Sequence, residues 1–171
     1  DGKPAYTDRP ITHDYLKMMN NATFGSEEGF ITVGEMSATT IDNCILYTAP
    51  ERKELSMAFN FHHLKVDYKD GQKWTIKDFD FEELKRLFHT WGEEMSVGNG
   101  WNALFYNNHD QPRALNRFVD IENFRNEGAT MLAASIHLSR GTPYIYMGEE
   151  IGMIDPDYNS MDDYVEVESI N

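Results

Sequence analysis

Residues 102–113 read NALFYNNHDQPR, and the stretch changes character at its midpoint. A mostly apolar run, typical of a buried strand, leads directly into amides, an imidazole, a carboxylate and an arginine. Polar groups at the end of a buried strand are typical of the carboxyl edge of a parallel sheet, where α/β proteins hold their functional residues. The stretch therefore predicts a strand followed by a functional loop that carries His109 and Asp110.

Helices and short apolar strands alternate along the rest of the sequence. Three segments have the apolar spacing of helices: 10–24, 80–98 and 126–139. Four short apolar runs predict strands: 30–33, 56–61, 102–106 and 142–148. Strands that are apolar throughout are buried on both faces, so the expected fold class is α/β, with a parallel sheet wrapped by helices.

Three details of these elements are also predicted. The first helix carries one apolar stripe, formed by Ile11, Tyr15, Met18, Met19 and Ala22. The second helix begins with a capping box of Asp80 and Glu83. The stretch 65–79, before that helix, is charged and rich in turn residues.

Composition excludes several classes of partner. The net charge of −14 argues against binding to nucleic acid or to an anionic membrane, and the chain contains no apolar run of membrane-spanning length. A single cysteine, Cys44, rules out an internal disulfide and fits a reducing, cytoplasmic compartment. Eight acidic residues fall within 149–171, which predicts a solvated acidic surface, with a divalent-metal loop as the alternative. We expect no cofactor and no metal.

The carboxylates at the strand ends suggest a chemistry. Glu35 follows the first predicted strand and Asp110 follows the third, so both are expected at one edge of the sheet. Paired carboxylates suit hydrolysis of a glycosidic bond, in which one protonates the leaving oxygen and others balance an oxocarbenium-like charge. The alternative is that both carboxylates cap helix N-termini.

Three segments give a more specific reading: ITVGEM at 31–36, NNHDQPR at 107–113 and GTPYIYMGEEIGM at 141–153. Together they resemble signature segments of the α-amylase family of glycoside hydrolases, in its α-glucosidase branch. The resemblance extends over the chain, from YTDRP at 6–10 to EVESIN at 166–171.

The resemblance implies roles for the residues that match. Glu35 corresponds to the general acid/base, Asp110 to the carboxylate that grips hydroxyls of the reacting sugar, and His109 to the adjacent hydroxyl donor. Arg113 and Arg117 are expected beside the leaving group, with a surface salt bridge as the alternative. Five aromatic residues are expected either to stack on sugars or to fill the core: Phe59, Phe61, Tyr106, Tyr144 and Tyr146.

The family's nucleophile, an aspartate in a G-F-R-x-D segment, has no counterpart in this sequence. The resemblance therefore implies that 1–171 form the C-terminal half of a truncated TIM (β/α)8 barrel, strands five to eight. The first half and the C-terminal β-domain are absent, which agrees with the roughly 250 residues of a complete barrel. We expect the isolated chain to be inactive, and its exposed barrel edges to allow self-association.

The stretch 57–74, MAFNFHHLKVDYKDGQKW, narrows the expected substrate. It resembles family members that cleave trehalose 6-phosphate to glucose and glucose 6-phosphate more than members that act on isomaltose-type sugars. A phosphate needs a cation, and Lys65 with His62 or His63 is the candidate, although the two histidines also suit structural hydrogen bonds. The remaining alternative is a non-catalytic interaction module of the same fold.

Overall fold

The computed structural model describes residues 3–165, apart from the side chains of residues 3–4 and 73–76. Within that range, four short strands form one sheet: β1 (Val33–Met36), β2 (Met57–Asn60), β5 (Asn102–Leu104) and β6 (Thr142–Pro143). The strands lie in the order β1-β2-β5-β6, and each neighbouring pair is parallel. The predicted α/β class with a parallel sheet is therefore confirmed.

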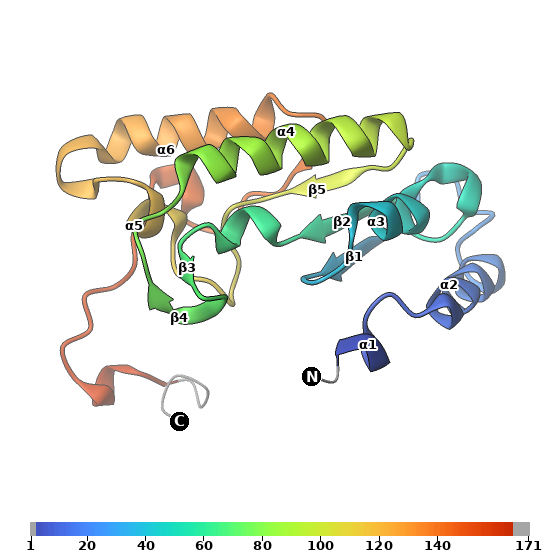
Figure 1. Ribbon diagram of the computed structural model, residues 1–171, viewed down its shortest axis with the longest axis horizontal. Helices are drawn as coiled ribbons and strands as arrows, with labels where there is room; N and C mark the ends of the chain where they lie inside the picture. Colours follow the sequence, from blue (N-terminus) through green and yellow to red (C-terminus); the bar gives the residue numbers. More distant parts are fainter. Residues whose placement is uncertain (1–2, 166–171) are drawn as a thin grey trace.

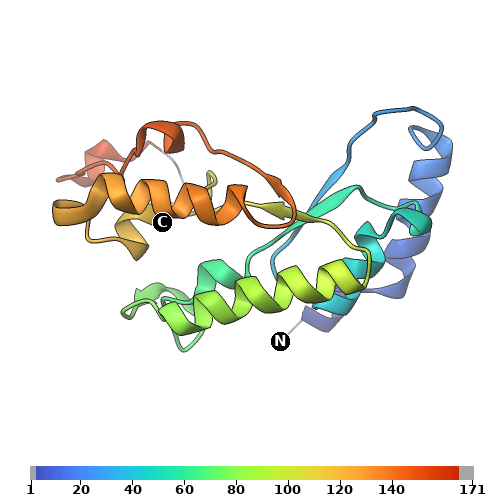
Figure 2. The same ribbon diagram turned by 90° about the horizontal axis from the view of Figure 1, so that it is seen from above.

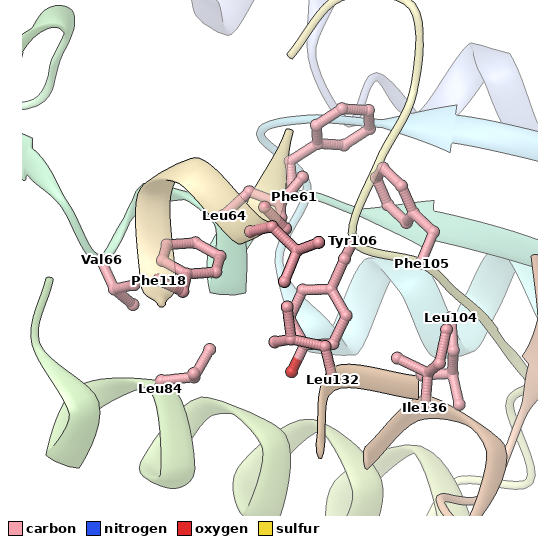
Figure 3. Packing of buried hydrophobic residues seen from close by; sticks show 12 residues of the cluster. Phe61, Leu64, Val66, Leu84, Leu104, Phe105, Tyr106, Phe118, Leu132 and Ile136 are labelled. Carbon is pink, nitrogen blue, oxygen red and sulfur yellow. The ribbon is translucent and has the colours of Figure 1, made fainter. Parts of the chain in front are cut away.

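Helices cover one face of this sheet (Figures 1 and 2). The longer ones are α2 (Pro10–Ala22), α3 (Ile41–Thr48), α4 (Phe81–Val97) and α6 (Ile121–His137). Side chains of α4 and α6 pack with β5 and the loop that follows it into one hydrophobic core (Figure 3). A second cluster joins Cys44 of α3 to Ala58 of β2 and to Trp91 and Met95 of α4.

Shorter elements complete the chain. They are two short helices, α1 (Lys3–Tyr6) and α5 (Ala114–Phe118), a hairpin of β3 (Tyr68–Lys69) and β4 (Gln72–Ile76), and four 3₁₀ turns, η1 (Pro50–Arg52), η2 (His62–Lys65), η3 (Glu149–Ile151) and η4 (Met161–Asp163). The sequence missed α3, which Thr40 caps by accepting a hydrogen bond from the backbone N–H of Asn43. It also assigned the hairpin segment to turns.

Several strand and helix boundaries in the structure differ from those predicted from the sequence. The first strand starts at Val33 rather than at Phe30, and the side chain of Phe30 is exposed. Helix α6 starts at Ile121, five residues earlier than predicted, because Asp120 caps it. The capping box of α4 is only half formed: Asp80 accepts from the Glu83 backbone N–H at 2.9 Å, but its own N–H donates to the carbonyl of Val66.

The apolar stripe predicted for α2 does not face a core in the described residues, where Ile11, Tyr15, Met18 and Met19 are exposed. The helix is held instead by a polar cluster around the buried carboxylate of Glu54. Nδ1 of His13 lies 2.6 Å from Glu54 Oε2, and an Arg52 nitrogen donates to Glu54 Oε1 at 2.8 Å. Charged hydrogen-bond partners therefore replace water around the Glu54 carboxylate, because a buried charge without partners would be strongly destabilising.

Candidate active site

A pocket of about 220 Å³ opens at the carboxyl edge of the sheet. Its walls come from four strand ends: Glu35 from β1, Phe59 and Phe61 from and after β2, Phe105, Asn107, Asn108 and His109 after β5, and Tyr144, Ile145 and Tyr146 after β6. Parallel pairing places Glu35 opposite Phe59, and Phe59 opposite Ala103. Residues that lie up to 111 positions apart in the sequence, from Glu35 to Tyr146, therefore line one space.

The pocket combines a carboxylate with aromatic walls. The side chain of Glu35 is exposed, and the ring of Phe59 contacts Phe105 at 4.9 Å and Tyr144 at 4.7 Å between centroids. Such a surface offers apolar faces to a sugar ring and one polar group to its oxygens, the usual composition of a small-ligand site. Of the aromatic residues proposed for stacking, all line the pocket except Tyr106, which is buried in the core.

The loop after β5 carries His109, which lines the pocket, and the neighbouring Asp110, which is not among the residues that line it. Nε2 of His109 lies 3.5 Å from Asp110 Oδ2, with their side chains 73% and 48% exposed. Asn108 shapes this turn by accepting the Asp110 backbone N–H at 2.9 Å. Asn107, which is buried, accepts the N–H of Ala114 at 2.7 Å and so fixes the base of the loop.

Lys65 stands at the same edge but outside the residues that line the pocket. It ends η2, after β2, and its Nζ donates to the carbonyl oxygen of Ser37, just beyond β1. The exposed lysine therefore bridges the loops that follow two neighbouring strands, one of which carries Glu35. Its position suits a cation at the rim of the site.

The structure separates His62 and His63 from the pocket. The ring of His63 is 7% exposed, contacts Phe88 and Tyr106, and donates from Nε2 to the carbonyl of Phe105 at 2.6 Å. Burial lowers its pKa to about 4. His62 packs against Trp91, and burial followed by the nearby Lys65 charge lowers its pKa as well. Both rings therefore face the helical layer. His63 makes a structural hydrogen bond there, whereas the buried Nδ1 of His62 has no hydrogen-bond partner among the described residues.

The contacts of Arg117 and Arg113 are with other parts of the protein, whereas the sequence predicted that both lie beside the leaving group. Arg117 forms a buried ion pair with Asp67, with side chains 8% and 6% exposed, and also donates to the carbonyl of Leu64. It therefore ties the η2 segment to α5. Arg113 donates to the carbonyl oxygen of Met147 at 2.8 Å and lies over the ring of Tyr146.

The sequence reasoning missed Asn107 and Asn108. The sequence could have predicted their role, because two amides that directly follow a buried strand are well placed to form hydrogen bonds within the loop that they begin. Phe105 and Ile145 were also missed, since apolar residues in a strand are usually assigned to the core.

The described part of the acidic segment, residues 149–165, shows no metal site. Among residues 3–165, no group of three or more His, Cys, Asp or Glu side chains is arranged to hold an ion, and Glu166 and Glu168 lie outside the described residues. In the same range, no helix is both long enough and apolar enough to cross a membrane.

The chain has a parallel sheet with a carboxylate, an imidazole and aromatic walls at its carboxyl edge. This arrangement is typical of α/β enzymes, which hold their active sites at the carboxyl ends of the strands. The chain belongs to the α-amylase family: the family described as the α-amylase catalytic domain matches residues 1–171. The resemblance inferred from the three sequence segments is thereby confirmed.

Particular relatives narrow the comparison. The trehalose-6-phosphate hydrolases of Bacillus subtilis (strain 168) and Escherichia coli (strain K12) are each 51% identical over 171 residues, all of this chain. The oligo-1,6-glucosidase of Parageobacillus thermoglucosidasius is 44% identical over 170 residues. The crystal structure of Bacillus licheniformis trehalose-6-phosphate hydrolase superimposes with a TM-score of 0.92 and 52% identity over 98% of this chain. The chain spans only about 30% of the length of these proteins.

Proposed function

We propose that the chain is part of a retaining α-glucosidase that hydrolyses trehalose 6-phosphate to glucose and glucose 6-phosphate. The observation that carries this proposal is the shared pocket, in which Glu35 and His109 meet between aromatic walls. The 51% identity to two trehalose-6-phosphate hydrolases supports the choice of substrate.

In this proposal Glu35 is the general acid and base. It protonates the glycosidic oxygen as glucose 6-phosphate departs, and it later removes a proton from the water that attacks the glycosyl-enzyme intermediate. Asp110 and His109 bind hydroxyl groups of the reacting glucose and favour its flattened, transition-state shape. The proposal is supported by the position of His109 in the pocket, by the 3.5 Å contact of Asp110 with His109 and by the exposure of both side chains.

We propose that Lys65 binds the phosphate of the leaving sugar. Its ammonium group lies at the rim of the site, bridging from the end of β2 to Ser37. A phosphate dianion gains most from a charged donor, and a charge-assisted hydrogen bond is roughly twice as strong as a neutral one.

The nucleophile in this scheme lies outside the chain. We propose that β1, β2, β5 and β6 are the fifth to eighth strands of a (β/α)8 barrel, and that an aspartate of the first half forms the glycosyl-enzyme intermediate. Without that aspartate the double displacement cannot begin. The 171-residue chain alone should therefore release no glucose from trehalose 6-phosphate above background.

A segment exchange tests the function directly. The matching 171 residues of the Bacillus subtilis relative are replaced by this chain, and glucose release is measured with trehalose 6-phosphate and with isomaltose. We expect the exchanged enzyme to hydrolyse trehalose 6-phosphate far better than isomaltose. The reverse preference would favour an oligo-1,6-glucosidase, to which the chain is 44% identical. No activity on either sugar, from a folded protein, would favour a non-catalytic interaction module.

We also propose that the protein is cytoplasmic and that the isolated chain self-associates through its barrel edges. Strand β1 is at one edge of the sheet; its first residue, Val33, is exposed, as are Phe30 and Ile31 just before it. An unpaired edge with exposed apolar residues favours pairing with another chain. Light scattering of the purified chain tests this, since a monomer at all concentrations would rule self-association out.

A further inference from the structure

One arginine joins the two loops that form half of the pocket. The backbone N–H of Arg113, in the loop after β5, donates to Asp155 Oδ1 at 2.8 Å. Its guanidinium group donates to the carbonyl oxygen of Met147, after β6, also at 2.8 Å. In return, the N–H of Asp155 donates to Asn116 Oδ1 at 2.7 Å. The loop after β6 is thus fastened to the loop after β5 at two points.

The same guanidinium group fixes one wall of the pocket. Its central carbon lies 4.8 Å from the centroid of the Tyr146 ring, a cation–π distance. The backbone of Tyr146 is held independently, because its N–H donates to Glu149 Oε2 at 3.1 Å. One side of the Tyr146 ring therefore contacts Arg113, while the residue also lines the space that contains Glu35 and His109.

The turn that brings Met147 to Arg113 depends on a glycine. Gly148 has a φ of +86°, which strains any residue with a side chain. A Cβ at this position would also lie 2.7 Å from Sδ of Met153, which itself accepts a hydrogen bond from Arg113 at 3.1 Å. The loop geometry and the arginine contacts thus depend on one another.

Arg113 is poorly placed to bind substrate itself. Two of its guanidinium nitrogens bond to Met147 and Met153, and its central carbon lies over the Tyr146 ring. A sugar hydroxyl or a phosphate would have to displace these contacts before it reached the guanidinium group. This differs from the direct leaving-group contact that the sequence suggested.

We propose that Arg113 is a positioning residue that holds Tyr146 as the face on which a hexopyranose ring packs beside Glu35 and His109. The inference rests on the proposed function for its substrate and extends it by naming this wall and its support. An aromatic face suits the apolar C–H surface of a sugar ring, and a ring held in place loses little entropy when the sugar binds.

Kinetics of the exchanged enzyme test this role. Arg113→Ala and Tyr146→Ala should each raise KM for trehalose 6-phosphate by about five- to tenfold and leave kcat nearly unchanged, because the contact binds ground state and transition state alike. The double variant should resemble either single variant, since both changes remove one contact. Arg113→Lys, which keeps a cation over the ring, should recover part of the loss. Arg86→Ala, an exposed arginine on α4, is the matched control and should change nothing.

Three kinetic outcomes would overturn the proposal. Additive effects of the two substitutions would mean that Arg113 does not act through Tyr146. A fall in kcat at constant KM would mean that Arg113 stabilises the transition state instead. An Arg113→Ala variant with unchanged kinetics would remove its role altogether.

A second measurement separates this proposal from the proposed function. In the 171-residue chain with ¹³C-labelled tyrosine, NMR relaxation should show a lower order parameter for the Tyr146 ring in Arg113→Ala, with the Tyr144 ring unchanged. Unchanged order at Tyr146 would refute the positioning role, whatever the enzyme does. If the exchanged enzyme hydrolyses neither sugar, the proposed function fails and the sugar-packing part of this inference fails with it, while the ring measurement still decides whether Arg113 holds Tyr146.

Discussion

Glu35 and Lys65 show how the ends of neighbouring strands decide which single residues lie at one edge of the sheet. Glu35 lies near the end of β1, Lys65 lies in the turn η2 after β2, and the parallel alignment of β1 and β2 brings both to one edge of the sheet. Neither residue is buried, so each remains accessible to a ligand. The two can be distinguished by experiment, because Glu35 should act on the bond that breaks and Lys65 on the phosphate.

Replacing Glu35 by glutamine should remove the general acid. In the exchanged enzyme we expect Glu35→Gln to lower kcat for trehalose 6-phosphate by about 10²- to 10⁴-fold. The loss in kcat/KM, which reports only formation of the glycosyl-enzyme, should be much smaller with a nitrophenyl glucoside, whose leaving group departs without protonation. The kcat should fall for both substrates, because Glu35 is also the base of the second step. Stopped assays with both substrates check this, and Glu94→Gln on α4 is the control. Equal losses in kcat/KM on the two substrates would contradict an acid role for Glu35.

Replacing Lys65 by alanine should affect only the phosphorylated substrate. A charge-assisted hydrogen bond contributes about 1.5–3 kcal/mol, so Lys65→Ala should raise KM for trehalose 6-phosphate by about ten- to a hundredfold. Activity on isomaltose should be unchanged, because that sugar has no phosphate. Lys85→Ala, an exposed lysine on α4, controls for the loss of charge. Similar losses on both sugars would mean that Lys65 acts by supporting the loop at Ser37.

At the scale of elements, the two longest helices make opposite use of an internal glycine. Gly92 in α4 has open space where a Cβ would lie, with no atom of its surroundings within 4 Å. Gly128 in α6 is packed against Val119, whose Cγ1 would lie 2.3 Å from an added Cβ. Gly92 therefore lowers the stability of α4 without a packing benefit, whereas Gly128 permits α6 to approach the end of α5.

The two glycines therefore give a matched pair of predictions. Gly92→Ala should stabilise the chain by about 0.5–1 kcal/mol, which is the difference in helix propensity. Gly128→Ala gains the same propensity but must displace Val119, so we expect a net loss of about 1–3 kcal/mol. Urea denaturation followed by circular dichroism measures both. If Gly128→Ala were as stable as Gly92→Ala, the close packing of α6 against Val119 would be wrong.

At the scale of the whole molecule, a buried histidine links folding to pH. His63 lies between the sheet and α4, bonded to the carbonyl of Phe105. His62 and Arg117 are the charged or titratable groups that act on it, and both oppose its protonation. Its pKa falls from 6.5 to about 4 in the folded chain, so the unfolded chain binds the proton more tightly.

The free energy of unfolding should therefore decrease as the pH falls. Above pH 6.5 the imidazole is neutral in both states and its contribution to stability is complete; between 6.5 and about 4 only the unfolded state takes up the proton, so stability is lost. The loss approaches about 3 kcal/mol at most. Urea titrations at several pH values should show a weaker pH dependence for His63→Gln than for the parent chain. His89→Gln, an exposed histidine on α4, is the control and should leave the dependence unchanged.

Much of the fold could be predicted from sequence, where local chemistry decides. Continuous apolar runs predicted the strands, and the Asp80 cap and the apolar face of α4 predicted that helix. The predictions failed where distant partners decide. The α2 stripe is exposed, because the partner that holds this helix is the carboxylate of Glu54, 41 residues from His13.

The sequence by itself determined the order of the elements, the residue types at the strand ends and the family, because each depends on short segments with strong local patterns. Only the tertiary structure decided which of those strand-end residues share a space. Parallel pairing brought Glu35, His109 and Tyr146 to one pocket, while His63 in η2 and Arg117 in α5 are held away from it by buried partners, the carbonyl of Phe105 and the carboxylate of Asp67. The physical reason is that the local backbone sets the direction of each side chain. A side chain that points to the pocket stays in contact with water, whereas one that points to the helical layer is buried and needs a hydrogen-bond or charged partner there.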